Sequence, residues 1–152
     1  MIRDSRLSVV LHVLLHIAEH DAPVTSEALA RMIETNPVVI RRALAGLREQ
    51  GYVRSEKGHH GGWSLNRPLA EISLRDVYDA IGAPNLFAIG PRRDATDCLV
   101  EQAVNAALER SLDAAESLLL AAFSDVTLAS LSASFHDRLA EHRAAHTPKD
   151  KT

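Results

Sequence analysis

Cysteine and aromatic residues are scarce in this chain of 152 residues. The single cysteine, Cys98, excludes a disulfide within one chain and a metal site made of cysteines alone. Aromatic residues make up 4% of the sequence, against 46% for all hydrophobic residues. The expected core therefore consists mostly of Leu, Val, Ile and Ala, which favours packed helices over a sheet rich in aromatic side chains.

Long apolar runs and targeting signals are also missing. The apolar run near the N-terminus, residues 7–18, contains His12 and His16 and is too short to span a bilayer. A signal peptide would be followed by a cleavage site of small residues, and no such site follows this run. We therefore expect a cytoplasmic protein that makes no contact with a membrane.

The common catalytic signatures do not occur either. The sequence has no Gly-x-Ser-x-Gly, no glycine loop for phosphates before a helix and no zinc-binding His-Glu helix. His12, His16 and His20 fall on one helical face, where two imidazoles can hold a transition metal. Most such stripes are polar flanks of a helix, so we expect no metal site. Because the catalytic signatures are missing, we also expect that the protein is not an enzyme.

Charge is unevenly distributed along the chain, although the formal net charge is only -3. Residues 1–68 carry a net charge of +2 and residues 69–152 a net charge of -5. Within residues 36–67 the net charge is +4. A basic segment in an otherwise acidic chain indicates a local surface for nucleic acid.

The sequence of this basic segment predicts a helix with an exposed basic face. Asn36 is a favourable N-cap, Pro37 suits the first helical position, and Gly51 suits the end. The apolar residues at helical spacing are Ile40, Leu44 and Leu47. The residues expected to face outward are Val39, Arg41, Arg42, Ala45 and Arg48.

The flanking sequence predicts a helix-turn-helix followed by a β-hairpin wing. Thr25 or Ser26 caps a short preceding helix, in which Leu29 and Met32 are expected to point inward. The hairpin strands are expected over residues 52–54 and 63–65, with Gly61 and Gly62 supplying positive φ in the turn. Trp63 is expected to pack beneath the wing. An exposed basic helix beside a basic hairpin tip is suited to the major groove and neighbouring phosphates of DNA.

The rest of the chain predicts three more helices. Ser73 caps one through Ile81, residues 94–123 form the longest, and Thr127 caps the last, which is expected to fray from His142. The apolar stripe of the longest helix comprises Val100, Val104, Ala107, Leu108, Leu112, Ala115, Leu118, Leu119 and Ala122. One small domain cannot cover this stripe, so we predict a homodimer through it.

These elements define the expected fold class and domains. The fold is mainly α with a small β-hairpin wing, a winged helix-turn-helix plus a long C-terminal dimerisation helix. Residues 1–82 form the DNA-binding domain, residues 83–145 an effector loop and dimerisation helices, and residues 146–152 a flexible tail.

The run GHHGGWSLNRPLAEISLRDVYDAIG resembles the signature of the Rrf2 (Rrf-two) family of bacterial winged-helix regulators. That signature has a Gly-x-x-Gly-Gly-aromatic wing, an Arg-Pro pair, an Ile-Ser/Thr-Leu step and an Asp-Val-x-x-Ala-Ile helix. NPVVIRRALAGL resembles the recognition helix of one branch. The similarity covers nearly the whole chain. It implies a homodimer that binds a pseudo-palindromic operator in double-stranded DNA and usually represses transcription.

The resemblance, together with the residue chemistry, selects the candidate DNA-contacting residues. Arginine can bind guanine or phosphate, whereas the valines can make only apolar contacts such as one with a thymine methyl. The alternative to DNA contact is that the arginines lie on a solvated helix face and that the histidines belong to a polar turn. The candidates are Asn36, Val38, Val39, Arg41, Arg42, Lys57, His59 and His60.

Cys98 matches the last of three cysteines that hold an iron–sulfur cluster in some members of the family. Residues 86–97 contain no other cysteine, so we expect no cluster and no other cofactor. Cys98 is then either a small packing residue at the dimer junction, the preferred interpretation, or a redox-sensing thiol near a helix start. The sequence leaves three possibilities for the switch. They are oxidation of Cys98, a small ligand between the winged domain and the long helix, and no effector at all.

The sequence therefore predicts a sequence-specific DNA-binding transcriptional regulator, a homodimeric repressor. The alternative is a winged-helix protein-interaction module without DNA binding.

Overall fold

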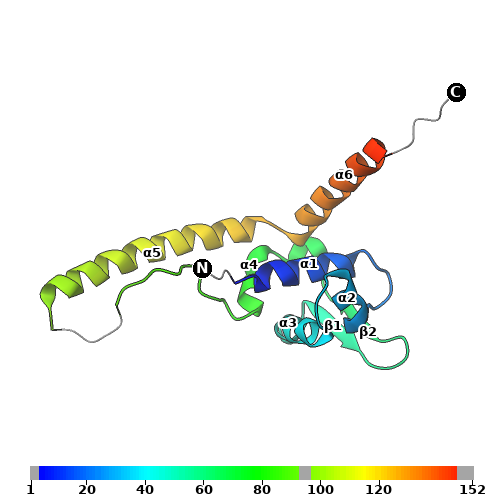
Figure 1. Cartoon of the computed structure of the whole chain (residues 1–152), viewed down its shortest axis with the longest axis horizontal. Helices are drawn as coiled ribbons and strands as arrows, with labels where there is room; N and C mark the ends of the chain where they lie inside the picture. The colour runs from blue at the N-terminus through cyan, green and yellow to red at the C-terminus, as the bar shows by residue number, and fades with distance from the viewer. Residues whose placement is uncertain (1–3, 93–96, 147–152) are drawn as a thin grey trace.

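The computed structural model describes residues 4–92 and 97–146 and shows a helical protein with one small hairpin (Figure 1). Its elements are α1 (Arg6–Ala18), α2 (Ser26–Met32), α3 (Pro37–Glu49), β1 (Val53–Glu56), β2 (Gly62–Leu65), a 3-10 turn η1 (Leu69–Glu71), α4 (Leu74–Ala80), α5 (Leu99–Asp125) and α6 (Leu128–His146). The predicted fold class, a winged helix-turn-helix followed by a long C-terminal helix, is confirmed.

The core lies inside the winged domain and is almost entirely aliphatic. It is formed by one face each of α1, α2, α3 and α4, by the inner side of the hairpin, and by the first residue of α6. The fully buried side chains are Val10, Val13, Leu14, Leu29, Ile40, Leu44, Leu47, Val53, Ile72, Val77 and Leu128. Trp63 is the one tryptophan of the chain and closes this core beneath the wing.

Helix α3 begins and ends where its sequence predicts. The Asn36 side chain accepts a hydrogen bond from the Val38 N–H at 2.8 Å, and Pro37 occupies the first turn. Gly51 follows the helix at φ 77°, a conformation that glycine adopts without strain. The three predicted inward residues are fully buried, which fixes the opposite face of the helix towards solvent.

The turn between α2 and α3 corrects one prediction. Met32 is not inward but 39% exposed, because the core side is taken by Leu29 and, one turn later, by Ile33. Glu34 then adopts φ 55°, and the Thr35 N–H bonds to the Ala30 carbonyl at 2.8 Å. This is the left-handed helix ending that lets α3 start directly at a new angle.

The hairpin is joined to the helix-turn-helix through Trp63. Its backbone pairs with that of Val24, with N···O distances of 2.8 and 3.0 Å, and its indole N–H donates to Ser26 Oγ at 2.9 Å. The expected packing role of Trp63 is thus confirmed. The strand register pairs Val53 with Leu65, Arg54 with Ser64, Ser55 with Trp63 and Glu56 with Gly62.

The two glycines of the wing are required for different reasons. Gly62 has φ 148°, and a Cβ there would lie 2.6 Å from the Val24 carbonyl oxygen. Gly61 has no positive φ, so the prediction for it was wrong. A Cβ on Gly61 would instead lie 2.2 Å from the Glu56 carbonyl oxygen. Both positions are limited by close backbone contacts rather than by the turn alone.

Helix α4 is fixed at its start by a reciprocal cap. The Asp76 N–H donates to Ser73 Oγ, and Asp76 Oδ2 accepts from the Ser73 N–H at 2.8 Å. Burial acts to raise the pKa of Asp76, but hydrogen bonds from Ser73 outweigh it, so the pKa of this carboxyl is lowered. The charged carboxylate also interacts favourably with the dipole at the N-terminus of the helix.

The boundaries of the last two helices differ from the prediction. Helix α5 starts at Leu99 with Cys98 as its N-cap residue, and it ends at Asp125. The predicted start at Asp94 lies outside the described residues. Helix α6 continues through His146 rather than fraying from His142, because alanines, good helix formers, extend it. Of the predicted flexible tail, residues 146–152, His146 lies in α6 and the rest lies outside the described residues.

The start of α6 is anchored in the winged domain. A short backbone bridge joins Ser73 to Thr127, the Leu128 N–H bonds to the Ile72 carbonyl at 2.8 Å, and the Leu128 side chain is fully buried. Helix α5 projects from this point as a long arm (Figure 1). None of the described helices combines the length and apolar character needed to cross a membrane.

A first prediction concerns Gly46, where α3 approaches the end of α4. A Cβ at this position would lie 2.0 Å from the Ala80 carbonyl oxygen. We expect Gly46→Ala to lower the free energy of unfolding by roughly 2 kcal/mol, because overpacking against backbone outweighs a helix-propensity gain of about 1 kcal/mol. Urea unfolding measures the change. Gly90→Ala is the control, since nothing lies within 4 Å of its added Cβ. Equal stability of the two variants would contradict the close approach of α3 and α4.

Candidate nucleic-acid interface

The outward face of α3 gathers most of the predicted contact residues. Val38 and Val39 are 45% and 43% exposed, although both are apolar, and Arg41 and Arg42 are exposed beside them. Asn36 is exposed at the helix start, but its side-chain oxygen is already used as the cap. Exposed valines on a helix with a well-formed apolar core face indicate a surface made for contact with another molecule.

Two adjacent arginines on this face differ in their surroundings. Arg41 Nη1 lies 3.3 Å from Glu27 Oε1 in the first turn of α2, with both side chains about half exposed. Arg42 makes no ion pair with any residue that the structure describes. An exposed ion pair contributes only about 0–1 kcal/mol, so Arg41 can exchange Glu27 for a phosphate. No local sequence pattern relates Glu27 to Arg41, because the two lie 14 residues apart.

The other arginines of the basic segment are exposed and also contact side chains within the domain. Arg48 lies over the Trp63 ring at 5.7 Å, and Arg67 lies over the Tyr52 ring at 4.8 Å. Arg54 pairs with Glu56 in the same strand at 3.6 Å. These contacts are cation–π and surface ion-pair interactions that fix the wing and the end of α3. All six basic side chains of the segment are exposed, and Arg41, Arg42 and Lys57 are the ones on the outward face of α3 and at the wing tip.

The wing tip presents the remaining candidates. Lys57, His59 and His60 are exposed in the turn after β1, and the two imidazole rings lie 4.7 Å apart. The tip and α3 border a shared cleft of about 290 Å³, lined by Arg41 and Arg48 on one side and by Gly58 and Gly61 on the other. The structure thus brings the predicted residues of α3 and of the wing to one side of the domain, the lower edge in Figure 1.

The histidine stripe of α1 forms a pair rather than a set of three. His12 Nε2 and His16 Nε2 are 3.0 Å apart, whereas His20 Nδ1 lies 2.8 Å from the His16 carbonyl oxygen. Partial burial lowers the pKa of His16, and the neighbouring His12 and His20 lower it further. A lowered pKa favours the neutral imidazole that a hydrogen-bonded pair requires.

The donor groups near Cys98 do not fit an iron–sulfur cluster. Cys98 is exposed at the start of α5 and is the sole thiol of the chain. Within residues 4–92 and 97–146, no group of three or more His, Cys, Asp or Glu side chains is placed to hold a metal ion. A cluster requires several thiolate or imidazole ligands at one point, and this segment supplies one.

The comparison with known families agrees with this geometry. The matching family model is Rrf2, described as an iron-dependent transcriptional regulator, and it spans residues 3–134. Two relatives are named as candidate HTH-type transcriptional regulators. YwnA of Bacillus subtilis is 33% identical over 74% of this chain and 84% of its own length. YffB of Lactococcus lactis is 31% identical over 81% of this chain and 80% of its own length.

The solved structures show the same architecture. The crystal structure of a candidate transcriptional regulator from Lactobacillus plantarum superposes with a TM-score of 0.73 at 28% identity. The match covers 94% of this chain and 99% of that one, so it includes the long α5 and α6 as well as the winged domain. From the helix-turn-helix, the wing, the long C-terminal helix and these similarities together, we conclude that the chain belongs to the Rrf2 family of winged-helix transcriptional regulators.

Proposed function

We propose that this regulator is a homodimeric repressor that recognises a pseudo-palindromic operator. The observation that carries the proposal is the outward face of α3, where Val38, Val39 and Arg42 are exposed together above a fully buried opposite face. The core holds this face rigidly, so that it enters a DNA groove without rearranging. A bound dimer represses by occupying the operator against other proteins.

The proposed binding mode assigns different roles to the two arginines. Val38, Val39 and Arg42 recur at helical spacing and face the major groove, where the valines meet thymine methyl groups and Arg42 meets a guanine. Arg41, displaced from Glu27, binds a phosphate at the groove edge, as does Lys57 from the wing. His59 and His60 extend the wing contact towards the adjacent minor groove. Asn36 keeps its cap and contacts the backbone through its free amide group.

The exposed surface of α5 supports the dimer. The helix has no buried residue in the single chain, and its exposed large apolar side chains are Leu99, Val100, Val104, Leu108 and Leu118. The described residues outside α5 pack against only part of it, through α4 and through Arg92, which contacts Glu101 and Asn105. A second copy related by a two-fold axis covers this stripe and presents two recognition helices to half-sites about one helical turn apart.

The competing proposal is a winged-helix module that binds another protein and not DNA. Exposed valines on α3 suit either partner, but the arginines and Lys57 favour a polyanion. Selection from a random duplex library at a stated salt concentration separates the two proposals. An enriched, two-fold symmetric motif supports DNA recognition, whereas the absence of any enriched motif would leave the protein-interaction module.

A second prediction tests the roles of the basic side chains. Lys57→Ala should weaken binding to every sequence and reduce the salt slope of log K by about one unit, because one phosphate contact is lost. Arg42→Ala should instead relax the preference at one position of each half-site, at a cost of roughly 1–3 kcal/mol. Affinities measured over a salt series on the selected operator and on single-base variants distinguish the two effects.

Arg75→Ala is the control for these variants. It removes the same charge from α4, where Arg75 pairs with Asp79 at 2.9 Å and lies outside the proposed interface. Its affinity and salt slope should match those of the wild type. A uniform loss for all three variants would mean that only overall charge matters, which is incompatible with the proposed roles.

A third prediction tests the dimer. Leu108→Glu would place a charge in each half of the two-fold interface, and an unpaired buried charge costs roughly 3 kcal/mol or more. The dimer should therefore dissociate at least about 100-fold more readily. Ala106→Glu is the matched control, because two residues along a helix place it on the opposite side. Sedimentation equilibrium at micromolar concentration gives both values. A wild-type monomer, or equal effects of the two variants, would refute dimerisation through this face.

A fourth prediction concerns switching without an iron–sulfur cluster. Cys98 is exposed at the start of α5, and if it senses oxidants rather than packing at the dimer junction, it forms an adduct or a disulfide with another chain. Operator affinity should fall several-fold in a mild oxidant and recover with a reductant, whereas Cys98→Ser should be insensitive. If the wild type and Cys98→Ser respond alike, Cys98 is a packing residue and the switch lies elsewhere.

A further inference from the structure

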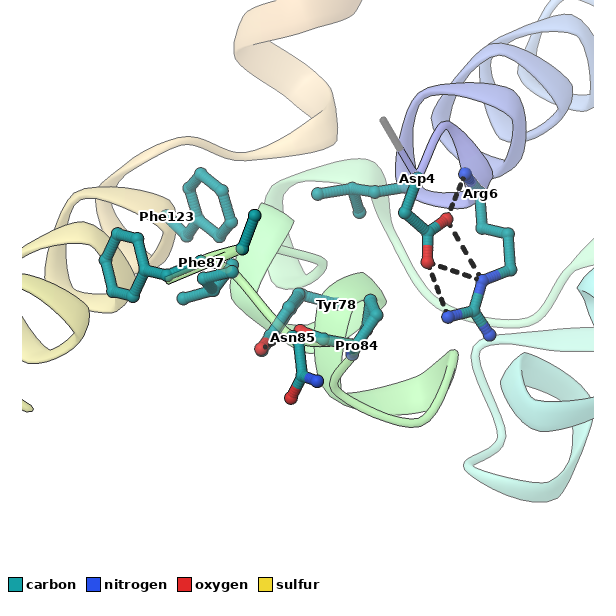
Figure 2. Close-up of a pocket in the computed structure, with 10 residues that line it drawn as sticks. Asp4, Arg6, Tyr78, Pro84, Asn85, Phe87 and Phe123 are labelled. Atoms are coloured by element: carbon teal, nitrogen blue, oxygen red, sulfur yellow. Dashed lines mark hydrogen bonds and ion pairs between the residues drawn. The ribbon is translucent and has the colours of Figure 1, made fainter. Parts of the chain in front are cut away.

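A cavity of about 740 Å³ lies between the winged domain and the end of α5 (Figure 2). Its walls come from four parts of the chain: the start of α1, helix α4, residues 84–88 and the last turns of α5. The lining residues are Asp4, Arg6, Leu7, Tyr78, Pro84, Asn85, Leu86, Phe87, Ala88 and Phe123. The volume is in the range of pockets that bind small molecules.

One side of the cavity is aromatic, which is unusual in this chain. The sequence has three Phe, two Tyr and one Trp, and half of these six rings line the cavity. Tyr78 and Phe123 meet edge to face with centroids 6.0 Å apart, and Figure 2 shows Phe87 beside Phe123. The Tyr78 hydroxyl donates to the Pro84 carbonyl at 2.7 Å, which holds residues after α4 against the ring. A further aromatic ring would complete this cluster by stacked or edge contacts.

The other side of the cavity carries one group of each charge. Arg6 Nε and Nη2 donate to the Asp4 carboxylate, with the shortest distance 2.6 Å from Nη2 to Oδ2. The two side chains are 61% and 38% exposed, so water and solutes reach both. The Arg6 guanidinium has donors beyond those directed at Asp4, and the Asp4 carboxylate has further lone pairs. Such a pair can accept a carboxylate at Arg6 and an ammonium group at Asp4 at the same time.

We propose that this cavity binds a small aromatic zwitterion, of the aromatic amino-acid type, as the effector of the regulator. The aromatic ring lies among Tyr78, Phe87 and Phe123. The carboxylate binds Arg6, and the ammonium group binds Asp4. Both ligand charges are then paired, which a ligand with a single charge does not achieve at this site.

The position of the cavity gives the ligand a route to the DNA-binding surface. Its walls join α1 and α4, which belong to the winged domain, to α5, which carries the proposed dimer interface. A bound ligand therefore restricts the angle between them and with it the separation of the two recognition helices. This consequence rests on the proposed function, whereas ligand binding itself does not. By linkage, operator DNA must change the ligand affinity by the same factor as the ligand changes the DNA affinity.

Calorimetry on the full-length protein without DNA tests the site. L-phenylalanine and L-tryptophan are the probes. The comparison ligands are 3-phenylpropionate, which lacks the ammonium group, phenethylamine, which lacks the carboxylate, and L-leucine, which lacks the ring. We expect both amino-acid probes to bind and each comparison ligand to bind at least roughly tenfold more weakly. No binding of either probe, or equal binding of any comparison ligand, overturns the assignment.

Three variants locate the binding. Phe87→Ala, in the segment after α4, and Arg6→Gln should each weaken L-phenylalanine binding by roughly tenfold. Ile89→Ala is the control, because Ile89 is 73% exposed and does not line the cavity. Unfolding curves of the variants establish that each remains folded. Unchanged binding in folded Phe87→Ala or Arg6→Gln would place the ligand elsewhere and refute the proposal.

Measurement with the selected operator then separates this proposal from the proposed function. L-phenylalanine should change the operator affinity of the wild type several-fold and leave that of Phe87→Ala unchanged. Ligand binding without any DNA binding would refute the proposed function and keep the site. DNA binding that is insensitive to a ligand bound at the site would refute its role as effector.

Discussion

The junction at Trp63 is the constraint on which the DNA-facing side depends. Its backbone pairs with Val24, its indole donates to Ser26 ahead of α3, and Arg48 of α3 lies over its ring. One residue therefore connects the wing to Val24, to the start of α2 and to the recognition helix. The wing packs so closely here that Gly62 leaves no room for a Cβ against Val24. The relative position of α3 and the wing follows from this junction.

A second junction relates this domain to the helices that follow. Leu128 is fully buried between elements of the winged domain, and its N–H bonds to Ile72. Helix α5 thus ends at a fixed point, while the rest of its length stays exposed in the single chain. A shift at the end of α5 would therefore change the angle between the winged domain and the long arm.

The description of the family names iron, yet this chain has few side chains around Cys98 that could bind it. The segment around Cys98 offers one thiol, and the described residues contain no metal-binding group of three donors. Three of the six aromatic rings and one ion pair lie elsewhere, around the cavity between Tyr78, Phe123 and the Asp4–Arg6 pair.

The sequence by itself determined the elements that depend on neighbours along the chain. Local patterns predicted the Asn36 cap, the buried stripe of α3, the Ser73 cap of α4 and the packing role of Trp63. The similarity of the sequence to one family extends over almost the whole chain. Only the tertiary structure decided which groups meet across long separations. It turned Met32 outward in favour of Ile33, paired Arg41 with Glu27, placed Arg48 and Arg67 over aromatic rings, and buried Leu128 in the winged domain. These outcomes depend on how helices pack and on which surface remains uncovered, and neither is encoded in the spacing of residues within a single element.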